Sequence, residues 1–134
     1  MSTAVDPITR SVIQHRLSSI VAEMGEAMLR TSYSQILNSS RDFSIAICDT
    51  RARLVAQADH IPVHVGALPW AVRAVEARFA DIAPGDVMLL NDPYHGGSHL
   101  PDLTAFVPVF ADGRRFFWTV VRAHQSDIGG ATHG

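Results

Sequence analysis

The sequence predicts an α+β fold, with an N-terminal helix, a second helix and a mostly antiparallel sheet built from hairpins. Two patterns support this prediction: apolar residues recur at helical spacing near the N-terminus, and apolar and polar residues alternate in several later segments. The connections between those segments are short, which favours antiparallel pairing because parallel strands need a long crossover. A chain of 134 residues can bury one hydrophobic core, so we expect residues 1–134 to form a single domain.

The first helix is predicted to begin at Asp6 and Pro7 and to end near Tyr33. Aspartate is a favoured N-cap, and proline is favoured at the first helical position. Apolar residues then follow at intervals that place them on one wide face of the helix. They are Ile8, Val12, Leu17, Ile20, Val21, Met24, Met28 and Leu29. The polar residues 34–41 that follow are predicted to form a turn.

Residues 43–48 and 54–57 are predicted to pair as a hairpin, because both are strand-like and a short polar segment joins them. The only cysteine, Cys48, ends the first of these strands. A single cysteine cannot form an internal disulfide, which agrees with a reducing compartment. No base or helix start is visible near Cys48 to activate its thiolate, so we expect a buried, unreactive thiol.

A second helix is predicted over residues 70–80, with Pro69 at its first position. The preceding segment, residues 58–68, contains Pro62, which argues against a helix interior there. A turn with the sequence Pro-Gly-Asp follows the second helix. An apolar strand is predicted after that turn, at residues 87–90.

The last third of the chain is predicted to be one hairpin flanked by two loops. Strands are expected at 103–110 and at 116–123, with a turn at Asp112-Gly113 between them. Residues 91–102 form the loop before this hairpin, and residues 124–134 follow it. Both loops contain histidine, aspartate and paired glycines.

Composition excludes several classes of function. All eleven basic residues are arginine, so a Walker-type phosphate loop has no candidate for its lysine. The formal net charge is −2 and there is no long basic run, which argues against nucleic-acid binding. No apolar stretch approaches the roughly 20 residues of a membrane span, and the N-terminus does not resemble a secretory signal. We therefore expect a cytoplasmic protein.

The candidate functional residues are two copies of the pattern His-x-x-Asp. His99 and Asp102 form the first, and His124 and Asp127 form the second. They lie just before and just after the predicted hairpin 103–123. Because the two strands of a hairpin run antiparallel, we expect all four side chains to converge at its open end.

Two imidazoles and two carboxylates suit a divalent metal ion such as Mn²⁺, Zn²⁺ or Fe²⁺, with positions left for water or substrate. The alternative is that these are ordinary loop residues, with Asp102 capping a turn and His124 ending a strand. His60 and His64 are further candidates for the same cleft, although packing or backbone hydrogen bonding is the commoner role. No other catalytic motif is present, and no catalytic residue is assigned.

Four separated segments together resemble the hydantoinase B/oxoprolinase family. They are residues 85–104, which contain Asn-Asp-Pro-Tyr-His-Gly-Gly-Ser-His-Leu-Pro-Asp, residues 122–130 (Arg-Ala-His-Gln-Ser-Asp-Ile-Gly-Gly), residues 40–44 (Ser-Arg-Asp-Phe-Ser) and residues 57–66 (Gln-Ala-Asp-His-Ile-Pro-Val-His-Val-Gly). The resemblance covers the chain from about Asp6 onward, in family order.

This resemblance implies a B-type subunit that works with an A-type subunit of the ATPase fold. Such pairs open cyclic amides of the hydantoin or 5-oxoproline type at the expense of ATP, which would be bound by the A-type partner. Related pairs carboxylate acetone or acetophenone and bind a divalent metal through the matching motifs. Carried over, the metal ligands are His99, Asp102 and His124. Asp127 becomes a fourth ligand or a residue that orients an imidazole.

One departure from the family is length, since family B subunits are several times longer. We therefore expect residues 1–134 to be the N-terminal segment of such a subunit, as a fragment, a truncated product or one piece of a split subunit. Apolar surface left exposed by truncation would favour association into an oligomer. Two alternatives stay open beside cyclic-amide hydrolysis: a subunit of a ketone carboxylase, and a non-catalytic assembly module.

Overall fold

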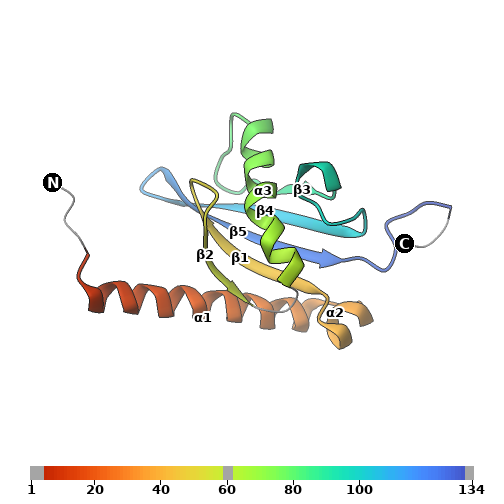
Figure 1. Ribbon diagram of the computed structural model, residues 1–134, viewed down its shortest axis with the longest axis horizontal. Helices are drawn as coiled ribbons and strands as arrows, with labels where there is room; N and C mark the ends of the chain where they lie inside the picture. Colours follow the sequence, from red (N-terminus) through yellow and green to blue (C-terminus); the bar gives the residue numbers. More distant parts are fainter. Residues whose placement is uncertain (1–4, 59–61, 132–134) are drawn as a thin grey trace.

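A five-stranded sheet lies between helix α1 on one face and helix α3 on the other (Figure 1). The computed structural model describes residues 5–58 and 62–131. In chain order the elements are α1 (Pro7–Thr31), α2 (Gln35–Ser40), β1 (Phe43–Asp49), β2 (Leu54–Ala58), α3 (Pro62–Arg78), β3 (Met88–Leu90), the 3₁₀ turn η1 (Pro93–His95), β4 (Asp102–Ala111) and β5 (Arg114–His124). The strand order is β2-β1-β5-β4-β3, and every neighbouring pair is antiparallel. The predicted α+β class and antiparallel sheet are confirmed.

Helix α1 begins as its sequence predicts. The Asp6 side chain accepts hydrogen bonds from the backbone N–H groups of Ile8 and Thr9, each at 3.0 Å, which satisfies two of the free donors at the helix start. The apolar face packs on the sheet from Leu17 onward. Ile8 and Val12, predicted to belong to the buried face, are exposed instead. The reason is that the first turns of α1 extend past the edge of the sheet (Figure 1).

Strand β1 is buried on both of its faces, because each face meets a different helix. Ile45 and Ile47 point to the α1 side, whereas Ala46 and Cys48 point to the α3 side. This follows from the two-residue period of a strand, which sends successive side chains to opposite faces. The result is a near-continuous apolar run in the centre of the sheet, and the predicted burial of Cys48 is confirmed.

The polar segment 34–41 forms a short helix, α2, where a turn was predicted. This mostly polar segment contains one residue that anchors it to the fold: Leu37 is buried with the α1-side core. The helix ends at Ser40, and its C-cap Arg41 has a left-handed backbone with φ of 50°. Tertiary packing of Leu37 therefore outweighs the weak helix preference of the serines and asparagine around it.

Helix α3 begins at Pro62, so the predicted start at Pro69 is wrong by seven residues. Pro69 lies inside the helix, where it removes one backbone hydrogen bond. Buried residues on both sides of Pro69, including Leu68 and Val72, pack against the sheet, and this burial offsets the lost bond. The earlier start matters for function, because it places His64 in the first turn of α3.

The predicted hairpin in the last third of the chain is confirmed as β4 and β5, each slightly longer than expected. Its turn residues Asp112 and Gly113 both have positive φ, of 50° and 72°, as a tight two-residue hairpin turn requires. The predicted strand at 87–90 is confirmed as β3. In the described residues, no helix combines the length and the apolar character that a bilayer crossing needs.

Burial raises the pKa of the Cys48 thiol from its ordinary value of 9.0 to about 11. Between these two values the unfolded chain has lost the proton and the folded chain keeps it. The free energy of unfolding should therefore fall as pH rises from 9 to 11, by up to about 1.4 kcal/mol per pH unit. Urea unfolding of the wild type and of Cys48→Ala at pH 8, 9 and 10 measures this contribution as a difference in slope. Identical slopes in the two proteins would contradict it.

Candidate metal centre

The open end of the β4–β5 hairpin carries the candidate site. Asp102 is the first residue of β4 and pairs directly with His124, the last residue of β5. The next pair on the same face, two residues along, is Thr104 with Arg122. Directly paired residues of an antiparallel ladder point to the same side of the sheet, so these four side chains form a patch on the face that α3 covers.

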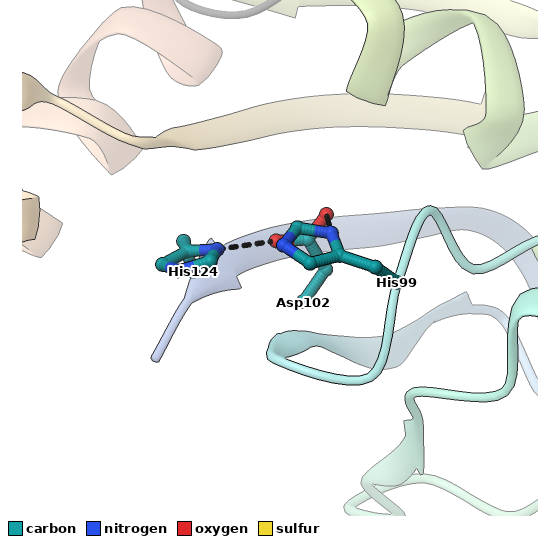
Figure 2. Close-up of side chains that lie close together, drawn as sticks. All are labelled: His99, Asp102 and His124. Atoms are coloured by element: carbon teal, nitrogen blue, oxygen red, sulfur yellow. Dashed lines mark hydrogen bonds and ion pairs between the residues drawn. The ribbon is translucent and has the colours of Figure 1, made fainter. Parts of the chain in front are cut away.

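His99 completes a group of three side chains at this end of the hairpin (Figure 2). Its Nδ1 lies 2.9 Å from Asp102 Oδ2, and the Nδ1 of His124 lies 3.1 Å from Asp102 Oδ1. The two imidazole rings are 4.9 Å apart between centroids and tilted by 30°. One potential ligand atom from each of the three residues lies within 4.8 Å of the others. The predicted convergence of His99, Asp102 and His124 is therefore present in the fold.

The three side chains differ in their access to solvent. The Asp102 side chain is fully buried, that of His124 is 23% exposed, and that of His99 is 50% exposed. The carboxylate thus forms the floor of the site, and the imidazoles form a rim that is open on one side. An ion held between them would keep an open side for water or substrate, as catalytic metal sites do.

His64, from the first turn of α3, lies against the same carboxylate. Its Nε2 is 3.2 Å from Asp102 Oδ2, and its side chain is 5% exposed. Burial lowers the pKa of His64, against the opposing effect of the Asp102 charge. Packing or a backbone hydrogen bond was the expected role of His64, and its contact with Asp102 was missed. The other histidine considered for this cleft, His60, lies outside the described residues.

Asp127 is not brought into the group of three. Its side chain is exposed and accepts a hydrogen bond from the backbone N–H of Gly129, at 2.8 Å. Within the described part of the chain, the cluster with metal-ligand spacing contains only the other three predicted residues. The loop after β5 turns away through Gly129 and Gly130, both with positive φ.

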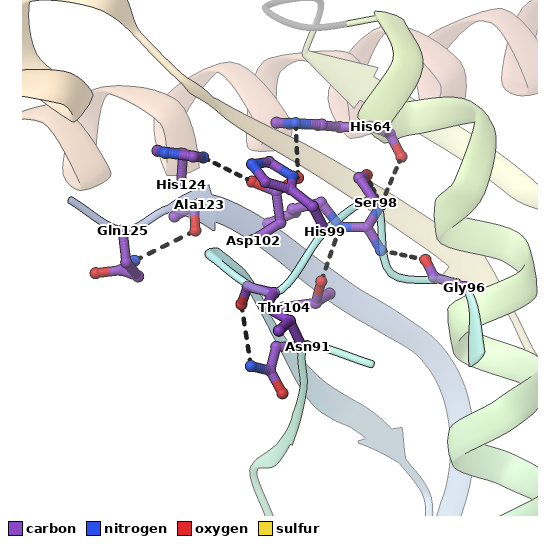
Figure 3. A network of polar contacts seen from close by, with 12 residues as sticks. His64, Asn91, Gly96, Ser98, His99, Asp102, Thr104, Ala123, His124 and Gln125 are labelled. Carbon is purple, nitrogen blue, oxygen red and sulfur yellow. Dashed lines mark hydrogen bonds and ion pairs between the residues drawn. The ribbon is translucent and has the colours of Figure 1, made fainter. Parts of the chain in front are cut away.

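Arg122 is a residue of the site that the sequence did not predict to belong to it. Its side chain is fully buried beside the three candidate ligands and donates hydrogen bonds to four groups around it (Figure 3). One sequence signal could have identified Arg122. It lies two residues before His124, so both side chains point to the same face of a strand. Arginine is rarely buried completely, so a sequence pattern alone does not predict it there.

The chemistry of the donor set fits a metal ion. In the described chain, Asp102 Oδ2 is buried and has no hydrogen-bond partner, although two imidazole nitrogens lie close to it. A buried carboxylate oxygen without a hydrogen bond is unfavourable. A cation shared by this oxygen and the nitrogens of His99 and His124 would satisfy it. Two imidazoles and one carboxylate are a common ligand set for divalent ions, so the residues fit.

The loop before β4 packs directly on helix α3 at Gly96. Its φ is +91°, and a Cβ atom built there would lie 2.4 Å from the backbone nitrogen of Ala71. Only glycine combines this backbone conformation with so close an approach. This close packing on α3 holds the segment that carries Ser98 and His99 beside the buried carboxylate.

The fold and the cluster together define a class: an α+β unit with a His-Asp-His group at the open end of a hairpin, under a helix start. Residues 6–134 match the family described as hydantoinase B/oxoprolinase. The chain belongs to this family.

Two relatives illustrate the match. The chain is 44% identical to a 5-oxoprolinase of Dictyostelium discoideum over 100% of its own length and 11% of that protein. It is 41% identical to the caprolactamase subunit beta of Pseudomonas jessenii over 94% of its own length and 22% of the subunit. The chain thus spans about a tenth of the first relative and about a fifth of the second.

Two solved structures share the fold. The ATP-dependent caprolactamase of Pseudomonas jessenii superposes with a TM-score of 0.89 and 39% identity, over 97% of this chain and 23% of the other. A nucleotide-free acetone carboxylase superposes with a TM-score of 0.86 over 94% of this chain and 17% of the other. At 21% identity, the second likeness shows the fold alone.

Substitution of Gly96 should disturb the contact between this loop and α3. Gly85 has almost the same φ, +92°, but open space around it, and is the matched control. We expect Gly85→Ala to lower the free energy of unfolding by about 1–2 kcal/mol through backbone strain alone. Gly96→Ala should lower the free energy of unfolding by about 1–3 kcal/mol more. The added Cβ would collide with the α3 backbone at Ala71, which would have to shift. Urea unfolding measures both, and equal losses would rule out the close packing on α3.

Proposed function

We propose that this chain is the metal-binding part of a B-type subunit in an ATP-coupled hydrolase that opens a cyclic amide. The observation that carries the proposal is the His99-Asp102-His124 cluster, in a chain 39–44% identical to enzymes of this kind. Both 5-oxoproline and caprolactam are cyclic amides, which supports this substrate class. Residues 1–134 would then form one N-terminal segment of the subunit.

His99, Asp102 and His124 would hold a divalent metal ion. When bound, such an ion supplies Lewis acidity toward an amide carbonyl. Mixed imidazole and carboxylate ligands suit Mn²⁺, Zn²⁺ or Fe²⁺ better than a thiolate-seeking metal. The buried Asp102 carboxylate contributes the negative charge, and the exposed side of His99 leaves room for substrate. Asp127 would enter only after a movement of the loop after β5.

ATP would be bound by a partner, the A-type subunit with the ATPase fold. The chain has no lysine, which excludes a Walker-type phosphate loop of its own. The caprolactamase relative is a beta subunit, which supports a multi-subunit assembly. In the proposed reaction the amide is activated by phosphoryl transfer from ATP. Water then forms a bond to the carbonyl carbon, and the C–N bond breaks as the ring nitrogen takes up a proton. A second water cleaves the resulting acyl phosphate and releases inorganic phosphate.

The ketone carboxylase alternative has weaker support, because the acetone carboxylase likeness extends to the fold alone. The assembly-module alternative requires neither a bound metal nor turnover. Both alternatives are separated from the proposal by the two experiments below.

Purified protein should retain nearly one equivalent of Mn, Fe or Zn, measured by elemental analysis. His99→Ala and His124→Ala should each abolish retention, because each removes one of three ligands. His95→Ala is the matched control, since His95 lies in the same loop and pairs with Asp92 at 2.7 Å instead. Asp127→Ala should retain the ion. Metal-free wild type with an intact fold would refute the metal site.

Mixed with an A-type subunit, the B-type subunit that contains this segment should support ATP-dependent ring opening of 5-oxoproline, hydantoin or caprolactam. Asp102→Asn should lower the rate at least about a hundredfold, because it removes the charge of the one carboxylate ligand. Asp112→Asn, in the distant hairpin turn, should have no effect. Turnover measured as ADP and ring-opened product decides the outcome. Turnover only with a ketone and bicarbonate would identify a carboxylase, and co-purification with neither metal nor turnover would identify an assembly module.

A further inference from the structure

Arg122 is a cation buried among neutral acceptors. Its side chain is fully buried, and no carboxylate of the described chain forms an ion pair with it. Burial lowers the pKa of Arg122, while the nearby charge of Asp102 opposes this effect. Burying a charge without a direct counter-ion is costly. Packing alone is therefore a poor explanation for an arginine at this position.

The four acceptors of Arg122 come from three separate parts of the fold (Figure 3). The Nε donates to Thr104 Oγ1 on β4, at 2.8 Å. One terminal nitrogen donates to Ser98 Oγ at 3.0 Å and to the backbone oxygen of His64 at 3.4 Å. The other terminal nitrogen donates to the backbone oxygen of Gly96. One planar guanidinium thus connects β4, the loop before it and the first turn of α3.

Three of these four acceptors lie next to or close to a residue of the candidate site. Ser98 immediately precedes His99, Thr104 lies two residues after Asp102, and His64 contacts the Asp102 carboxylate itself. His99 is half exposed, so its own packing does little to hold it in place. A shift of Ser98 would move the His99 imidazole away from the other ligands.

We propose that Arg122 is the positioning residue of the metal centre. Its guanidinium fixes the His99 loop and the start of α3 against the hairpin, and this alignment sets the affinity for the ion. The proposal rests on the metal site proposed above. It assigns Arg122 no contact with metal or substrate. A lysine would keep the charge but lose the planar fork that reaches four acceptors at once.

Arg122→Lys should weaken the binding of Mn²⁺ alone about ten- to a hundredfold, measured by titration against a competing chelator. Amide hydrogen exchange at residues 96–99 should become faster in the metal-free variant, with protection in β1 unchanged. Ser98→Ala removes a single acceptor, leaves the arginine in place, and should cost a smaller, several-fold loss of affinity. Val21→Ala is the stability control, because Val21 belongs to α1 and is buried in the core on the opposite face of the sheet.

The outcomes separate this proposal from the metal site itself. Wild-type affinity and exchange in Arg122→Lys would overturn the positioning role. The proposal would also be overturned if Val21→Ala lost as much Mn²⁺ affinity as Arg122→Lys at the same free energy of unfolding. Lower global stability would then explain the loss of affinity in both variants. If Arg122→Lys does not fold, Ser98→Ala decides, and unchanged affinity and exchange there would overturn the proposal. If the wild type binds no Mn²⁺, the proposed function fails. Amide hydrogen exchange at residues 96–99 in the variants then still decides whether Arg122 positions this loop.

Discussion

The arrangement of the site depends on one buried carboxylate. Asp102 is fully buried at the open end of the β4–β5 hairpin, and three imidazole groups have nitrogens within 3.2 Å of its two oxygens. A carboxylate in such a place is unfavourable unless its oxygens find donors or a cation. Three histidines from different parts of the fold place nitrogens beside these oxygens. His124 comes from the paired strand, His64 from the start of α3, and His99 from the loop that Gly96 packs on that helix.

The two faces of the sheet differ in the side chains that they bury. The α1 side is an apolar core, in which Val21 and Leu37 pack against Ile45 and its neighbours. The α3 side is apolar at the centre of the sheet and polar at the open end of the hairpin, where Thr104 and Arg122 are buried. A rigid double-layer core next to a buried polar patch is a suitable base for a site whose ligands come from separate segments.

Much of the fold was predictable because its signals are local. Helical spacing and the Asp6-Pro7 start mark α1, and alternation marks β1, β4 and β5. The errors arose where tertiary packing outweighed local preference. Buried Leu37 holds a helix in a polar segment, and packing of α3 on the sheet carries the helix through Pro69. Ile8 and Val12 fit the helical stripe, yet the sheet does not reach them.

The sequence by itself determined the family and the group of His99, Asp102 and His124, because motif spacing and the pairing of a hairpin bring those residues to one end of the fold. Only the tertiary structure decided what surrounds them. It placed His64 and Arg122 beside Asp102, and it left Asp127 on the exposed loop. These contacts join residues up to 58 positions apart. No local pattern encodes such a separation, since it depends on how α3 packs across the finished sheet.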